Sequence, residues 1–162
     1  MTAPQKTGPQ KPDPQRPDPL SKRRLKTWIR LLGVTRAAES HLREFLRVNH
    51  DTTLPRFDVM AALWRRREGV TMSELSRMLL VSNGNATAVV DRLEKDGLAR
   101  RSQSETDRRT VFVALTDEGL TLFEGLAIEH EREVNALFDR LTETDLDTLT
   151  EIFKRMGKGE KP

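Results

Sequence analysis

Apolar residues recur at helical spacing over most of this chain. Between Lys22 and about Asn49 there is no proline and a single glycine, and apolar side chains return every three or four residues. The pattern predicts one helix of about 40 Å, at 1.5 Å of rise per residue. Because a helix of this length cannot bury its apolar stripe within one small domain, we expect it to pack against a partner subunit.

Two shorter helices are expected next. The run RFDVMAALWRR, which follows Pro55, keeps helical spacing and is closed by a glycine a few residues later. Thr71 and Glu74 have the spacing of a capping box, and Val70 and Leu75 have that of a hydrophobic staple. Two independent features therefore place the start of the next helix at the same residue.

The stretch VSNGNATAVVDRLEKDGLARR starts with small polar residues, continues as an amphipathic helix and completes a helix-turn-helix pattern. Gly84 and Ala88 lie on its outer face, where small residues would let the backbone approach a surface closely. Short polar side chains near a positive helix N-terminus suit the major groove of DNA. A solvated helix, whose polar residues only cap and turn it, is the alternative. The candidate DNA-binding residues on this helix are Ser82, Asn83, Asn85, Thr87 and Arg92.

A basic β-hairpin is predicted after this helix. Residues 98–101 and 110–115 have strand character, and the polar segment SQSETDRR lies between them. A hairpin appended to a helix-turn-helix is a wing, and arginine suits insertion into a narrow minor groove. A merely solvated hairpin is the alternative. The candidate DNA-binding residues of the hairpin are Arg100, Arg108 and Arg109.

Proline and charge are distributed unevenly. Six of the eight prolines fall within the first 19 residues, which predicts a disordered tail. Residues 20–55 hold eight Lys and Arg against three Asp and Glu, whereas residues 116–156 hold four against eleven. The excess of positive charge in residues 20–55 indicates a polyanionic partner. Alternatively, this basic helix could pack against the acidic helices at 116–156.

Several classes of function are excluded. The chain has no cysteine, which excludes disulfide scaffolds, thiolate zinc sites and cysteine redox sensing. It has no apolar run near the ~20 residues of a membrane span and no apolar segment at its N-terminus. We therefore expect no membrane association and a cytoplasmic protein. No catalytic constellation, phosphate loop or cofactor motif occurs, so we expect neither an enzyme nor a cofactor. Three scattered histidines, His41, His50 and His130, do not predict a metal site.

In succession these motifs resemble the MarR family of winged-helix transcription regulators. The family pattern is a recognition helix, a D-x-L-E-x-x-G-L step, and a wing with D-R-R before a strand that ends in L-T-x-x-G. The resemblance covers residues 22–156. The matching residues are Asp91, Leu93, Glu94, Gly97 and Leu98, then Asp107, Arg108 and Arg109, then Leu115, Thr116 and Gly119.

The resemblance implies a mostly α fold with a small β-hairpin wing, a winged helix-turn-helix, and an intertwined helical homodimer. Its wing pattern implies that Asp107 steadies the hairpin through an arginine, while Arg108 or Arg109 reaches the minor groove. The expected segments are a disordered Pro-rich tail (1–20), a dimerisation helix (21–55), a DNA-binding winged helix-turn-helix (56–115) and C-terminal dimerisation helices (116–158).

The resemblance implies a repressor that occupies a pseudo-palindromic operator on double-stranded DNA until it binds a small molecule. The segment TLPRFDVMAAL resembles family members that govern aromatic acid breakdown, so the expected effector is a phenolic acid or an aryl coenzyme A thioester. Arg36, His41 and Asp58 are the candidate effector residues, because polar groups near the first two helices could orient an aromatic acid. A winged-helix module that binds protein or RNA without an operator is the alternative.

Overall fold

The computed structural model describes residues 19–104, 107 and 109–157. The chain divides into two units, residues 1–39 and residues 40–162. Helix α1 (Pro19–His50) is the predicted long helix, and its first 21 described residues form all that is described of the first unit. The predicted tail (1–20) therefore ends too late: Pro19 and Leu20 already belong to α1, because proline is tolerated in the first turn of a helix. The rest of the tail lies outside the described residues.

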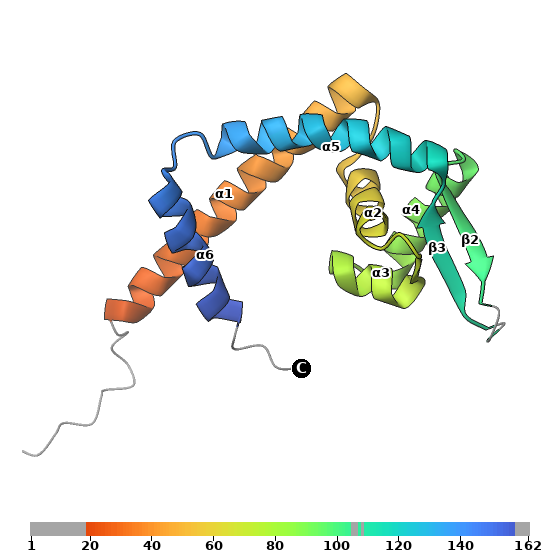
Figure 1. Ribbon diagram of the computed structural model, residues 1–162. Helices are drawn as coiled ribbons and strands as arrows, with labels where there is room; N and C mark the ends of the chain where they lie inside the picture. Colours follow the sequence, from red (N-terminus) through yellow and green to blue (C-terminus); the bar gives the residue numbers. More distant parts are fainter. Residues whose placement is uncertain (1–18, 105–106, 108, 158–162) are drawn as a thin grey trace, which may run out of the picture. The chain divides into compact units, whose positions relative to one another are not determined.

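The second unit holds the end of α1, three further helices, a small sheet and two C-terminal helices (Figure 1). Its elements are α2 (Leu54–Arg65), β1 (Val70–Thr71), α3 (Met72–Leu79), α4 (Asn83–Lys95), β2 (Ala99–Gln103), β3 (Val111–Leu115), α5 (Asp117–Leu137) and α6 (Glu143–Gly157).

The three strands form one antiparallel sheet in the order β1-β3-β2. The β2–β3 hairpin runs from the pair Ala99 and Leu115 to the pair Gln103 and Val111, so its strands are close to those predicted. Strand β1 was not predicted. It has only two residues, Val70 and Thr71, and it exists because β3 offers them an edge to pair with.

Capping side chains begin the helices where the sequence indicates. Thr71 and Glu74 form the capping box of α3, with both of its hydrogen bonds present. Thr116 Oγ1 accepts from the backbone N–H of Gly119 at the start of α5, as predicted. Thr142 takes the same role before α6, where the backbone N–H of Asp145 donates to its hydroxyl.

The apolar core lies within the second unit and joins the end of α1 to α2, α3, α4, the sheet and the start of α5. Its largest fully buried side chains include Leu46, Met60, Leu63, Leu75 and Leu93. Helix α6 contributes nothing to it. The residues predicted to face inward from α6 are not buried within one chain: Leu146 and Met156 are exposed, and Leu149 and Ile152 are half-buried.

Candidate nucleic-acid interface

The start of α4 presents polar groups to solvent. Ser82 is its N-cap, with extended backbone (φ −66°, ψ 150°), and its hydroxyl accepts from the backbone N–H of Asn85 at 3.3 Å. Asn83, Gly84 and Asn85 are exposed, and a Cβ atom at Gly84 would meet no atom within 4 Å. This end of the helix is therefore open enough for a flat or grooved partner to approach its backbone.

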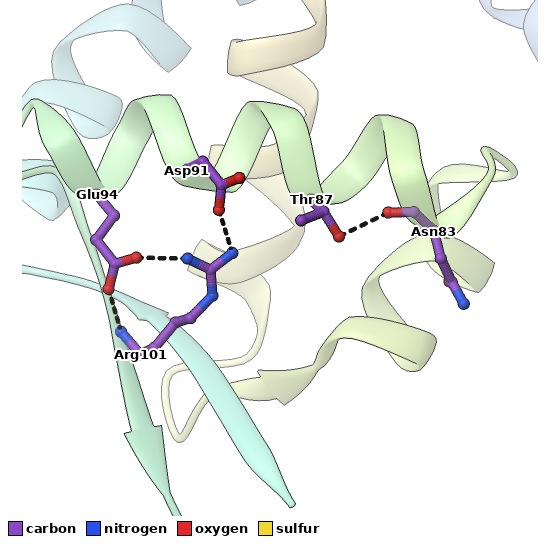
Figure 2. Close-up of polar contacts among 5 residues, drawn as sticks. All are labelled: Asn83, Thr87, Asp91, Glu94 and Arg101. Carbon is purple, nitrogen blue, oxygen red and sulfur yellow. Dashed lines mark hydrogen bonds and ion pairs between the residues drawn. The ribbon is translucent and has the colours of Figure 1, made fainter.

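The opposite face of α4 holds it in the core. Ala86, Val90 and Leu93 are buried, Val89 is half-buried and Ala88 is exposed, so the predicted inner and outer faces are confirmed. The hydroxyl of Thr87 donates to the carbonyl oxygen of Asn83 at 2.8 Å (Figure 2). Thr87 therefore presents its methyl group and the acceptor side of its oxygen, rather than a free proton.

Arg101 on β2 binds α4 through two carboxylates (Figure 2). Its guanidinium lies 2.6 Å from Asp91 and 2.5 Å from Glu94, and its backbone N–H also donates to Glu94 at 3.1 Å. Burial lowers the pKa of Arg101, but the hydrogen bonds that its guanidinium donates to these carboxylates outweigh burial, so the pKa is raised overall. The sequence shows several arginines in the hairpin, but nothing in their spacing singles out the one that faces the helix.

A second ion pair holds the far end of α4. Arg56 on α2 lies 2.7 Å from Asp96, the residue that follows the helix. Together with Arg101 it ties α4 to β2 on one side and to α2 on the other. Helix α4 is thus fixed at its C-terminal half, while its N-terminal half is left exposed.

The tip of the wing is organised by Asp107. Its carboxylate accepts from the backbone N–H of Arg109 at 3.0 Å and from the hydroxyl of Thr110 at 2.9 Å. These two hydrogen bonds lower the pKa of Asp107. Asp107 therefore holds the main chain of Arg109, while its expected contact with an arginine side chain stays a prediction. Arg100 and Arg109 are exposed, and Arg108 lies outside the described residues.

The wing is anchored to α5 by a close backbone contact. The hydroxyl of Thr116 donates to the carbonyl oxygen of Gly97 at 2.7 Å, and its N–H donates to the carbonyl oxygen of Leu98 at 3.1 Å. A Cβ atom on Gly119 would lie 2.0 Å from that same carbonyl oxygen of Leu98. The spacing of Gly97, Thr116 and Gly119 in the sequence is therefore explained by packing, since only glycine fits at the last position.

The three candidate effector residues differ in their surroundings. Arg36 is exposed on the part of α1 that belongs to the first unit. His41 Nε2 lies 2.6 Å from Glu133, and it lines neither of two cavities beside α2. Asp58 lines both of those cavities, which measure about 320 Å³ and about 370 Å³.

The larger cavity has aromatic and cationic walls that the sequence did not reveal. It is lined by Phe57, Asp58, Arg65 and His130, among others. The ring of His130 stacks on that of Phe57 with centroids 4.1 Å apart, and burial lowers the pKa of His130. The contact joins α5 to α2, and helical spacing alone cannot indicate which histidine lies opposite which aromatic ring.

Within the described ranges, no three His, Asp or Glu side chains gather as a metal site would require. In the same ranges no helix is both long and apolar enough to cross a membrane.

Comparison with known proteins gives a consistent result. The MarR family model matches residues 52–111. The HTH-type transcriptional regulator MhqR of Bacillus subtilis (strain 168) is 28% identical over 142 residues, which cover 88% of this chain and 97% of MhqR. The crystal structure of Sco3205 from Streptomyces coelicolor, in complex with DNA, aligns with a TM-score of 0.80 at 27% identity, over 91% of this chain and 94% of that one. A mutant MarR from E. coli, complexed with operator DNA, aligns with a TM-score of 0.70 at 27% identity, over 86% and 98% of the chains.

Proposed function

We propose, from the premise that this chain belongs to the MarR family of DNA-binding transcriptional regulators, that it is a repressor which occupies a pseudo-palindromic operator as a homodimer. It is a regulator and not an enzyme. The observation that carries the proposal is the start of α4, where Ser82, Asn83 and Asn85 surround an unobstructed glycine.

The chemistry of this end of α4 fits base edges in a major groove. An asparagine side chain can pair with adenine through two hydrogen bonds, and the helix N-terminus favours a nearby phosphate. Gly84 lets the helix backbone come close, since it has no side chain to hold the DNA away. Asn83, Asn85 and Thr87 would contact bases, while Ser82 and Arg92 would contact phosphates.

The wing would supply the second contact. Arg100 and Arg109 are exposed on a hairpin whose tip is held by Asp107 and whose base is held by Arg101. An arginine carried by a hairpin that is braced in this way can enter a narrow minor groove. Arg108 is the other candidate at the tip.

Exposed apolar residues support the homodimer. Trp28, Ile29 and Val34 of α1 are exposed, and so are Phe153 and Met156 of α6. Large apolar side chains concentrated in this way on helices mark surfaces that a partner covers. We assign residues 21–55 and 116–158 to dimerisation, and residues 56–115 to DNA binding.

The effector would be an aromatic acid or its coenzyme A thioester, held in the cavity of about 370 Å³. The aromatic ring would pack against His130, whose ring stacks on the buried Phe57, and a carboxylate would pair with Arg65. Among the three candidate effector residues, only Asp58 lines this cavity, and Arg65 supplies the positive charge for the acid. A ligand between α2 and α5 could shift α4 through the core that joins them.

The experiment begins with the duplexes that the purified full-length chain selects from a random pool. If the chain is such a repressor, the selected duplexes should share an inverted repeat with half-site centres about 10 base pairs apart. Each duplex should bind one dimer, and the affinity should fall steeply as the salt concentration rises. Transcription from a promoter overlapping the selected site should also be blocked in vitro. Binding of single-stranded RNA with higher affinity, or failure to select any duplex, would favour the interaction module instead.

A further inference from the structure

Leu80 occupies a backbone conformation that leucine rarely adopts. It lies between α3 and α4 with φ 55° and ψ 36°, which is the left-handed region. The N–H of Leu80 donates to the carbonyl of Arg77, and the N–H of Val81 donates to that of Ser76. This is the Schellman arrangement at a helix C-terminus, in which glycine or asparagine normally takes the position of Leu80 because its side chain is not strained there.

The side chain of Leu80 gains nothing from the fold in return. It is 92% exposed, the highest value among the large apolar residues of the described chain. Its neighbours Met78 and Val81 are also exposed, at 39% and 41%. A strained conformation combined with an unburied apolar side chain destabilises the folded protein, so the combination points to a function rather than to packing.

The position of Leu80 indicates its partner. It precedes the N-cap of α4, Ser82, by two residues and Asn83 by three, so it continues the surface assigned above to the major groove. In that groove the apolar group is the C5-methyl of thymine, and aliphatic side chains recognise it by contact. A polar partner would not favour an exposed isopropyl group.

We propose that Leu80 is a specificity-determining residue that packs against a thymine methyl group at one position of each half-site. This inference rests on the proposed function, since it requires α4 to enter the major groove. It adds an apolar contact to the hydrogen bonds of Asn83 and Asn85. The strain at Leu80 is then tolerated because DNA covers the side chain in the complex.

The test combines a protein change with a DNA change. Deoxyuridine pairs like thymine but lacks the C5-methyl, so each thymine of the selected operator is replaced in turn. Leu80→Asn removes the apolar group and suits the left-handed backbone, whereas Leu80→Met keeps an apolar side chain and serves as the matched control. Affinities are measured by fluorescence anisotropy with the full chain, and stability is measured by thermal melting.

We expect one thymine replacement to weaken the wild-type protein by about fivefold, as loss of one buried methyl contact implies. Leu80→Asn should weaken binding to the unmodified operator by a similar factor, and the two changes together should weaken it no further. Leu80→Met should keep its preference for thymine at that position. The melting temperature of Leu80→Asn should equal or exceed that of the wild type.

Three results for the Leu80→Asn variant would overturn the inference. The variant could bind the operator as tightly as the wild type does, or it could keep the preference of the wild type for every thymine. The third such result is a melting temperature far below that of the wild type. Failure of the proposed function looks different. In that case the wild-type protein itself selects no duplex, or Asn83→Ala binds the selected duplex as well as the wild type does. If Asn83→Ala weakens binding to the operator and Leu80→Asn does not, only the role of Leu80 is refuted.

Discussion

The guanidinium of Arg101 lies 2.6 Å from the carboxylate of Asp91, so a strand of the wing is joined directly to helix α4. Glu94 completes the cluster on the same guanidinium. If α4 enters the major groove as proposed, its two carboxylates would repel phosphates, and Arg101 would offset part of that charge. The cluster thus ties β2 to α4 and reduces the negative charge that α4 exposes.

We predict that Arg101→Gln weakens operator binding by about tenfold, while it lowers the free energy of unfolding by less than about 1 kcal/mol, as for other partly exposed ion pairs. The loss should exceed that expected of one missing charge, because two carboxylates are left uncompensated. Adding Asp91→Asn to Arg101→Gln should restore part of the affinity. A double variant that binds no better than Arg101→Gln would show that the cluster has no electrostatic role.

Gly119→Ala should destabilise the fold by about 2 kcal/mol or more, because its Cβ atom would lie 2.0 Å from the carbonyl oxygen of Leu98. Gly125→Ala is the matched control on the same helix, where a Cβ atom meets nothing within 4 Å. That substitution should stabilise α5 by about 0.5–1 kcal/mol. Urea unfolding of both variants measures the difference. Equal stabilities would refute the close contact between the start of α5 and the base of the wing.

Arg109→Ala should weaken operator binding by about 1–3 kcal/mol if its side chain enters the minor groove. The fold should persist, since Asp107 holds the backbone N–H of Arg109 and not its side chain. Arg47→Ala, at an exposed arginine of α1 paired with Glu44, removes the same charge outside the wing and should leave affinity nearly unchanged. Similar losses in both variants would indicate a general charge effect instead of a wing contact.

His130 should make stability depend on pH. Burial beside Phe57 lowers the pKa of His130 in the folded protein, so the unfolded chain binds this proton more readily. Its contribution is complete above the unfolded value of about 6.5 and is lost as the pH falls through the lower folded value. The melting temperature of the wild type should therefore drop more between pH 7.5 and pH 5 than that of His130→Phe, which keeps the stack. The pairs of His41 and His50 with glutamates are common to both proteins and cancel in the comparison. An equal drop in both would contradict the shift.

Local features of the sequence predicted much of this fold because they act locally. The capping box at Thr71, the cap at Thr116 and the two faces of α4 depend on residues within a turn of one another, and all three are confirmed. Strand β1 depends on an edge supplied by residues some forty positions away, so no local pattern indicated it.

The same distinction separates the candidate residues that the sequence can single out from those that only the structure singles out. Asn83 and Asn85 are recognisable because they stand at the start of a helix. Arg101 is not recognisable in this way, since its partners lie on another element and its neighbour Arg100 is chemically identical. The inward face predicted for α6 is unburied in one chain, which is expected if the second subunit covers it.

The most direct test of the account is a pair of binding isotherms for Asn83→Ala, one on the selected operator and one on a random duplex of equal length. The start of α4 reads bases in this account, so operator affinity should fall by about tenfold or more, while affinity for the random duplex should stay within about twofold. Circular dichroism should be unchanged, because the cap hydroxyl of Ser82 and the carbonyl that accepts from Thr87 both remain. Unchanged affinity for the operator, or an equal loss on both duplexes, would mean that α4 does not read the sequence of the DNA.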